Sequence, residues 1–149
     1  MLGLLVVTAI SCKKLDQEPE NLLSSSALTD YSGVLNAAYY YQLGSVTPMA
    51  VMGDFRADNA YMEEAPFDEF DKFGPGLTAM EDQFFGPFYT ALYKSILSAN
   101  NVIENSTNAT QVGEAKFIRA LSYYKLVLAF GDVTVNLSAS PDITDATIL

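Results

Sequence analysis

The longest helical pattern of apolar and polar residues covers residues 112–130, VGEAKFIRALSYYKLVLAF, and is followed by Gly131. Its flanks are apolar as well, so we expect a central helix of an all-α structure with neighbours on several sides. Gly131 stands where a C-terminal cap with positive φ is favoured. The predicted core-facing residues are Phe117, Ala120, Leu121, Tyr124, Val127 and Leu128, and the predicted solvent-facing residues are Lys116, Arg119, Ser122 and Lys125.

A second strong helical pattern covers residues 84–105, with Pro87 in the first turn, where proline is tolerated. Only residues 106–111 separate it from the central helix, which predicts an antiparallel helical hairpin. We expect Asn100 and Asn101 to form local or cross-helix hydrogen bonds. The predicted apolar stripe consists of Phe85, Phe88, Leu92, Ile96, Ala99 and Ile103.

A third helix is predicted over residues 28–43, with Ser26 or Thr29 as the N-cap and Gly44 as the stop. It contains the triplet 39–41, YYY, which spreads over most of the helix circumference. We therefore expect one or two of these tyrosines in the core and one exposed for stacking.

The rest of the chain has weaker patterns. Residues 49–53 favour a short helix followed by loop, residues 63–83 favour loop, and the alternation over residues 133–137 favours a short strand.

The N-terminal stretch is typical of a bacterial lipoprotein. Residues 2–10 are an apolar run too short to span a bilayer, and residues 9–12, AISC, resemble a lipobox. We expect a signal peptide at 1–11, lipid attachment at Cys12 and a polar tether over residues 12–27. The alternative is a plain buried thiol at Cys12. Because the usual basic n-region is missing, either the start is misassigned or the true N-terminus lies upstream.

Composition excludes many functions. The chain has 18 acidic and 8 basic residues, a net charge of −10, which disfavours nucleic acid as a partner. It has no histidine and one cysteine, so histidine-dependent catalysis and histidine or cysteine-cluster metal sites are excluded. We expect no enzyme activity, no cofactor and no metal.

Carboxylates dominate residues 54–71, which hold a single arginine. A Ca²⁺ site and a paired-carboxylate hydrolytic site, for example with Asp68 and Asp71, are the alternatives to a solvated acidic loop. The EF-hand spacing is absent, and charge runs are usually solvated, so we favour the acidic loop.

Several ordered motifs resemble the SusD/RagB family, the surface glycan-binding lipoproteins of Bacteroidetes. Residues 113–115 (GEA), 119–124 (RALSYY) and 130–133 (FGDV) match the family's central helix and its exit. Residues 93–103 resemble the preceding helix, and the region around Cys12 resembles the lipoprotein start. The sequence departs from the family pattern at Thr134, where proline is usual, and it has no tryptophan.

The resemblance implies an all-α fold of TPR-like antiparallel helix pairs with long irregular loops, in which residues 28–149 form an incomplete N-terminal domain. Such a fragment is expected to be unstable alone and to expose part of its apolar surface. The implied function is capture of oligosaccharide at the outer-membrane surface for a TonB-dependent, SusC-like transporter. The alternative is a TPR-like lipoprotein that binds another protein in a tyrosine-lined groove.

A loose positional match to the family implies a ligand-binding segment after the first helix. The candidate residues are Arg56, Asp58, Asn59 and Tyr61. The alternative for this segment is structural: a salt bridge of Arg56 with neighbouring acids, and packing of Tyr61.

Overall fold

A computed structural model describes residues 28–65, 67–72, 84–139 and 147–148. The predicted signal peptide, Cys12 and the tether lie outside the described residues. Helices dominate the described chain, so the predicted all-α class is confirmed. The elements are α1 (Ser32–Gln42), the 3₁₀ helix η2 (Leu43–Ser45), α2 (Val46–Arg56), α3 (Glu69–Lys72), α4 (Gly86–Asn105), α5 (Ala109–Phe130), β1 (Thr134–Val135) and β2 (Thr147–Ile148).

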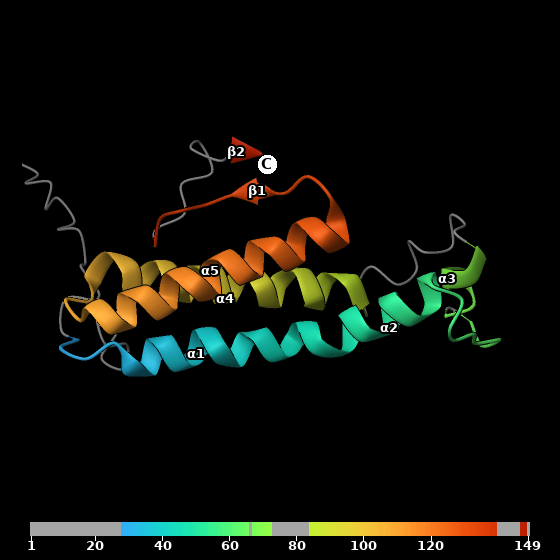
Figure 1. Cartoon of the computed structure of the whole chain (residues 1–149), viewed down its shortest axis with the longest axis horizontal. Helices are drawn as coiled ribbons and strands as arrows, with labels where there is room; N and C mark the ends of the chain where they lie inside the picture. The colour runs from blue at the N-terminus through green and yellow to red at the C-terminus, as the bar shows by residue number, and fades with distance from the viewer. Residues whose placement is uncertain (1–27, 66, 73–83, 140–146, 149) are drawn as a thin grey trace, which may run out of the picture.

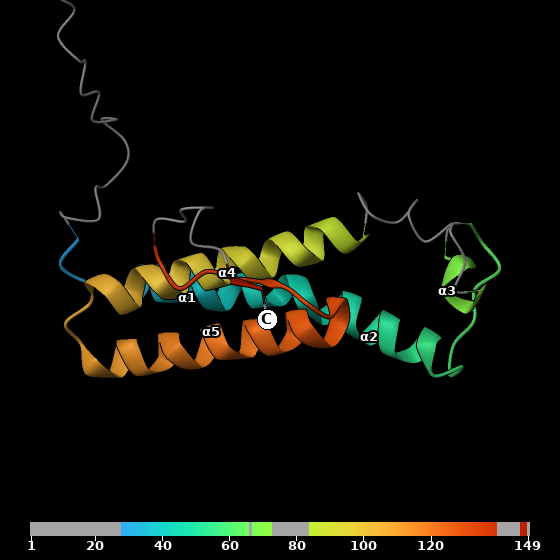
Figure 2. The ribbon, with the colours of Figure 1, turned by 90° about the horizontal axis from the view of Figure 1, so that it is seen from above.

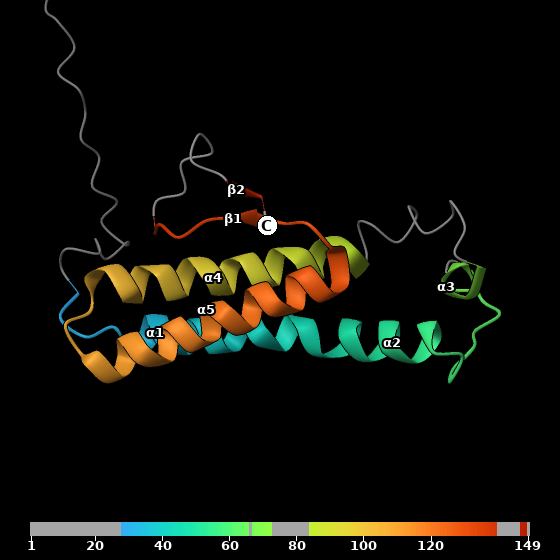
Figure 3. The same ribbon diagram turned by 45° about the horizontal axis from the view of Figure 1, so that its top comes forward.

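The helices α4 and α5 form the predicted antiparallel hairpin, and α1 packs beside both of them (Figures 1 and 2). Asn108 caps α5, because its side chain accepts hydrogen bonds from the backbone N–H groups of Thr110 and Gln111. Gly131 ends α5 with φ 78°, as predicted. β1 and β2 pair antiparallel on the side of the hairpin away from α1 (Figure 3).

The predicted end of the first helix near Leu43 is confirmed, since α1 ends at Gln42, but Gly44 does not end the helical path of the chain. The chain continues from α1 through η2 into α2, which is longer than the predicted helix at 49–53 (Figure 1). A Cβ at Gly44 would lie 2.5 Å from the Cβ of Ala91 on α4. Glycine is therefore needed here for close approach of two helices rather than for chain termination.

The predicted N-cap residues of the first helix are not confirmed. Ser26 lies outside the described residues, and Tyr31 occupies the N-cap position. Asp30 has the capping role, since its carboxylate accepts hydrogen bonds from the backbone N–H of Ser32 at 3.0 Å and from its hydroxyl at 2.6 Å.

The core consists of two apolar clusters, and the predicted stripe of α4 runs through both. Phe88, Leu92, Ile96 and Ala99 of that stripe are buried. One cluster is formed mainly by α2, α3, α4 and the end of α5, and the other by α1, α4 and the first half of α5. The buried residues of the first are Met52, Phe55, Phe70, Phe88, Leu92, Ile96, Leu126 and Val133, and those of the second are Tyr31, Leu35, Ala38, Ala99, Val102, Ala115 and Ile118.

The predicted orientation of the central helix is wrong. Phe117, Tyr124 and Leu128 are 64%, 64% and 58% exposed, whereas Ser122, which was predicted to face solvent, is fully buried. The inward face of α5 consists of Ala115, Ile118, Ser122 and Leu126. Apolar surface is exposed on α5, as expected, but it lies on the face of the helix that was predicted to pack into the core.

A polar layer separates the two apolar clusters and explains this orientation. The amide nitrogen of Gln42 donates to the hydroxyls of Ser95 at 2.8 Å and Ser122 at 2.5 Å. Lys125 donates to the amide oxygen of Gln42 at 2.9 Å and to the hydroxyl of Ser45 at 2.8 Å. These bonds satisfy polar groups that would otherwise keep this face of α5 out of the interior.

The tyrosine triplet lies at the surface rather than in the core. Tyr39 and Tyr40 are exposed and Tyr41 is half-buried, so the prediction of at least one core tyrosine is wrong. The hydroxyl of Tyr39 donates to Glu114 at 3.0 Å, and the ammonium of Lys94 lies 5.9 Å from the ring centroid of Tyr41.

The predicted loop over residues 63–83 contains one helical turn, α3. Its Phe70 is buried and stacks on Phe55 with ring centroids 5.4 Å apart. This contact attaches α3 to the end of α2, where the candidate ligand segment begins. The predicted strand at 133–137 is confirmed over the two residues of β1.

Candidate functional site

Arg56 stands in the last turn of α2 and lines a groove between α2 and the end of α5. The groove has a volume of about 320 Å³. We call it the arginine groove; its lining residues are Met49, Met52, Gly53, Arg56, Leu128 and Ala129. It offers an apolar surface with one guanidinium, a combination suited to a ligand with a nonpolar face and hydroxyl or anionic groups.

The other predicted ligand residues follow Arg56 in an exposed turn. Backbone N–H groups of Asn59 and Ala60 both donate to the carbonyl of Asp54, at 2.9 and 3.3 Å, which holds the turn against the end of α2. Asp58 has φ 55°, the left-handed region that is costly for a residue with a side chain. The structure thus brings Arg56 to the groove but leaves Asp58, Asn59 and Tyr61 outside its lining.

The structural alternative for this segment is only partly realised. Within the described part of the chain, Arg56 forms no salt bridge with a neighbouring acid. Tyr61 is 66% exposed, and its hydroxyl donates to the carboxylate of Glu63. The exposed guanidinium of Arg56 therefore remains accessible to a ligand.

The acidic segment forms no recognisable metal centre in the described residues. No three His, Cys, Asp or Glu side chains gather there in a way that would hold a metal ion. Of the hydrolytic pair considered above, Asp68 is half-buried beside α3, and the side chain of Asp71 lies outside the described part.

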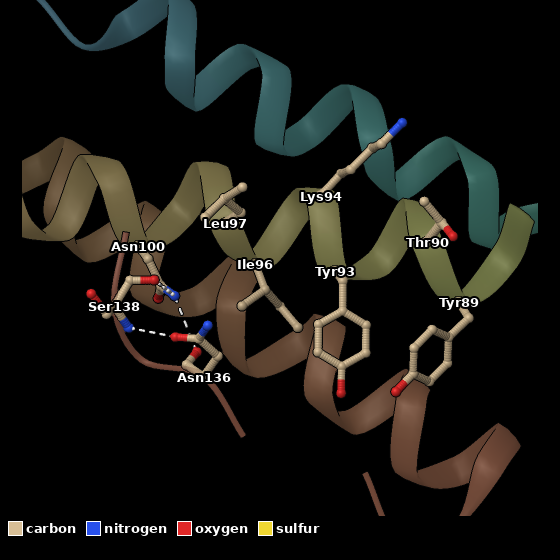
Figure 4. A pocket seen from close by; sticks show the side chains of 9 residues that line it. All are labelled: Tyr89, Thr90, Tyr93, Lys94, Ile96, Leu97, Asn100, Asn136 and Ser138. Carbon is tan, nitrogen blue, oxygen red and sulfur yellow. Dashed lines mark hydrogen bonds between the residues drawn. The ribbon is translucent and has the colours of Figure 1, made fainter. Parts of the chain in front are cut away.

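A second cavity, of about 310 Å³, lies along α4 where it meets the segment after β1 (Figure 4). We call it the tyrosine pocket. Tyr89 and Tyr93 stand one helical turn apart with ring centroids 4.6 Å apart, and Figure 4 shows both rings on the same side of α4 as Asn136. The complete lining is Tyr89, Thr90, Tyr93, Lys94, Ile96, Leu97, Asn100, Asn136 and Ser138.

Hydrogen bonds fix the two walls of the tyrosine pocket. The hydroxyl of Tyr93 donates to the carbonyl of Thr134 at 2.6 Å. The amide nitrogen of Asn100 donates to the carbonyls of Asn136 and Ser138, at 3.1 and 3.0 Å, and its oxygen accepts from Arg119 at 2.9 Å. The predicted cross-helix role of Asn100 is therefore confirmed, and the residue is structural rather than free for a ligand.

Burial changes the acidity of the phenols in this region. It raises the pKa of Tyr93 well above its ordinary value, and the neighbouring hydroxyl of Tyr89 adds to the effect. Burial also raises the pKa of Tyr123, whose hydroxyl donates to the carbonyl of Asn136 at 2.7 Å. Both phenols are therefore neutral hydrogen-bond donors at physiological pH.

The tyrosine pocket was not predicted from the sequence. The spacing of Tyr89 and Tyr93, four residues apart on one helix face, is the signal that was available. The place of Asn136 in the pocket could not be predicted from local sequence, because only the turn after α5 brings residues 134–138 back along α4.

No helix in the described part of the chain is long and apolar enough to cross a membrane. A search of curated proteins and a search of solved structures each found no match. A comparison with protein families found a match to the SusD-like family described as "Starch-binding associating with outer membrane", over residues 12–148. The match covers nearly the whole chain and includes every helix described above. The chain therefore belongs to the SusD-like family of starch-binding proteins that associate with the outer membrane.

Proposed function

We propose that the chain captures oligosaccharide at the cell surface and delivers it to a TonB-dependent, SusC-like transporter in the outer membrane. The observation that carries the proposal is the family match over residues 12–148. It is supported by the arginine groove, which places an accessible guanidinium beside apolar surface. In this proposal Arg56, Asp58, Asn59 and Tyr61 contact the ligand, and the chain binds without catalysing a reaction.

Starch retention tests the ligand site. Wild-type chain is expected to be retained on insoluble starch, and Arg56→Ala is expected to lower the affinity by roughly tenfold, the usual cost of losing a charged hydrogen-bond donor. Lys116→Ala is the matched control, because Lys116 is also an exposed cation but lies on α5 away from the groove. Equal retention of the wild type and the Arg56 variant would show that Arg56 does not contact the starch.

Membrane attachment is proposed to depend on a lipid at Cys12, with the chain exposed at the cell surface. Acyl chains anchor a protein without a spanning helix. Cys12→Ala is expected to move the chain from the membrane fraction to the soluble fraction and to abolish incorporation of labelled fatty acid. A variant that stays in the membrane fraction would contradict the anchor.

The exposed apolar face of α5 favours a second candidate function, a protein-interaction module. Phe117, Tyr124, Val127 and Leu128 leave a row of large apolar side chains in solvent. Purification of the chain from outer-membrane extracts separates the two functions. Co-purification of a transporter together with starch binding supports oligosaccharide capture, whereas a stable protein complex without starch binding supports the module.

A further inference from the structure

We propose that the tyrosine pocket is a second carbohydrate subsite, which holds one unsubstituted pyranose ring of an oligosaccharide. The inference rests on the proposed oligosaccharide function but concerns residues outside the arginine groove. The groove is lined by α2 and α5, whereas the pocket is lined by α4 and the segment after β1, and the two share no residue.

The aromatic wall suits a sugar ring. A pyranose has a face of C–H groups, which packs on aromatic rings, and a rim of hydroxyls, which needs hydrogen-bond partners. Tyr89 is 37% exposed, and its ring is held by Phe130 in an edge contact with centroids 5.2 Å apart. The hydroxyl of Tyr93 is already used on Thr134, so this side chain presents its ring rather than a free hydroxyl.

Asn136 supplies a polar group for the rim. Its side-chain oxygen accepts from the backbone N–H of Ser138 at 2.9 Å, which fixes the orientation of the amide. The two N–H donors of that amide have no partner among the described residues. In Figure 4 Asn136 lies in a row with Ile96, Tyr93 and Tyr89. A pyranose ring stacked on the two tyrosines would therefore direct one of its hydroxyls toward the Asn136 amide.

Size and opening agree with a single ring. A volume of about 310 Å³ lies at the lower end of the range for small-molecule pockets. Tyr89 and Leu97, at 37% and 41% exposure, leave the pocket accessible from solvent. Among the described residues, the lining offers a partly buried aromatic surface, one oriented amide and the cation Lys94, and it includes no carboxylate that would favour a cationic ligand.

A titration with maltotriose, followed by two-dimensional amide NMR, tests the subsite. The full chain is used in a detergent without a sugar head group, because an alkyl glycoside would compete. The side-chain amide signal of Asn136, identified by its loss in Asn136→Asp, is expected to shift saturably. Asn136→Asp keeps the acceptor for Ser138 and removes the donors, so it is expected to weaken binding by roughly tenfold.

Tyr89→Leu tests the aromatic wall, with Tyr124→Leu as control, since Tyr124 is an exposed tyrosine on α5. The Tyr89 substitution is expected to weaken maltotriose binding by roughly tenfold and the control to leave it unchanged. Saturable binding that depends on Arg56 but moves neither Asn136 nor Tyr89 would overturn the subsite while the proposed function stands. Absence of any binding by the folded wild-type chain would overturn both.

Discussion

At the scale of single residues, Gly44 shows how one missing side chain decides the course of the chain. The hydrogen that replaces a side chain there lets η2 lie against α4 beside Ala91. Because the contact is between two Cβ positions that are fixed to their backbones, no rotamer change relieves it. We call the consecutive helices α1, η2 and α2 the rod. The contact at Gly44 sets the distance between this rod and α4.

Gly44→Ala is therefore expected to lower the free energy of unfolding by about 1–3 kcal/mol, the usual cost of overpacking. Chemical denaturation followed by circular dichroism measures it. Gly53→Ala is the matched control: it also lies on this rod, its added Cβ meets nothing within 4 Å, and it is expected to stabilise by about 0.5–1 kcal/mol through helix propensity. Equal effects of the two substitutions would contradict the close approach.

Tyr93 gives a prediction about alkaline pH. Its pKa is raised in the fold, so the neutral phenol stabilises the folded state fully below the ordinary pKa of 10.0. As the pH rises from there toward the folded-state pKa, the unfolded chain ionises first and this stabilisation is lost. The fall of unfolding free energy between about pH 9 and about pH 11 is expected to be shallower in Tyr93→Phe than in wild type.

The Tyr93→Phe variant also loses the hydrogen bond to Thr134, so its stability at neutral pH is expected to be lower. The decisive quantity is thus the slope with pH rather than the stability at one pH. Tyr124→Phe, on the exposed face of α5, serves as the control. Parallel slopes for wild type and Tyr93→Phe would contradict the raised pKa.

At the scale of the elements, the polar layer determines which side of α5 faces the interior. Gln42 on α1 joins Ser95 on α4 to Ser122 and Lys125 on α5. Burial lowers the pKa of Lys125, whose ammonium has amide and hydroxyl acceptors here. Its charged form therefore depends strongly on Gln42, which is its acceptor on α1.

Gln42→Met keeps the volume of the side chain but removes this acceptor, and it is expected to cost about 1–3 kcal/mol of unfolding free energy. The double variant Gln42→Met/Lys125→Met removes the stranded ammonium as well, so its cost is expected to be smaller than the sum of the single costs. Denaturant titration of the wild type, Gln42→Met, Lys125→Met and the double variant measures the coupling between the two side chains. Additive costs would show that the two side chains do not act together.

The same layer explains which parts of the fold were predictable. The C-terminal ends of α4 and α5, the apolar stripe through Phe88 and Leu92, and the cap at Gly131 follow from local patterns, and these predictions are confirmed. The start of α5 was predicted three residues too late, because its cap at Asn108 was not recognised. The inward face of α5 does not follow from them, because Ser122 and Lys125 are polar and their partner Gln42 lies 80 and 83 positions away. The apolar pattern alone therefore assigned the wrong face of α5 to the core.

At the scale of the whole molecule, the two sites proposed for carbohydrate lie on different elements. Arg56 was identified from the family resemblance, and it does line a groove. The tyrosine pocket depends on the return of residues 134–138 along α4, so its Asn136 had no local signal. Together with the family match, the groove and the pocket support the proposal that this chain binds oligosaccharide.

Oligosaccharide binding is tested by calorimetric titration of the full wild-type chain with maltoheptaose, in a detergent without a sugar head group. We expect saturable binding that is weakened by Arg56→Ala and by Asn136→Asp, and unchanged by Lys116→Ala. A folded chain that shows no saturable binding of maltoheptaose and no retention on insoluble starch would contradict it.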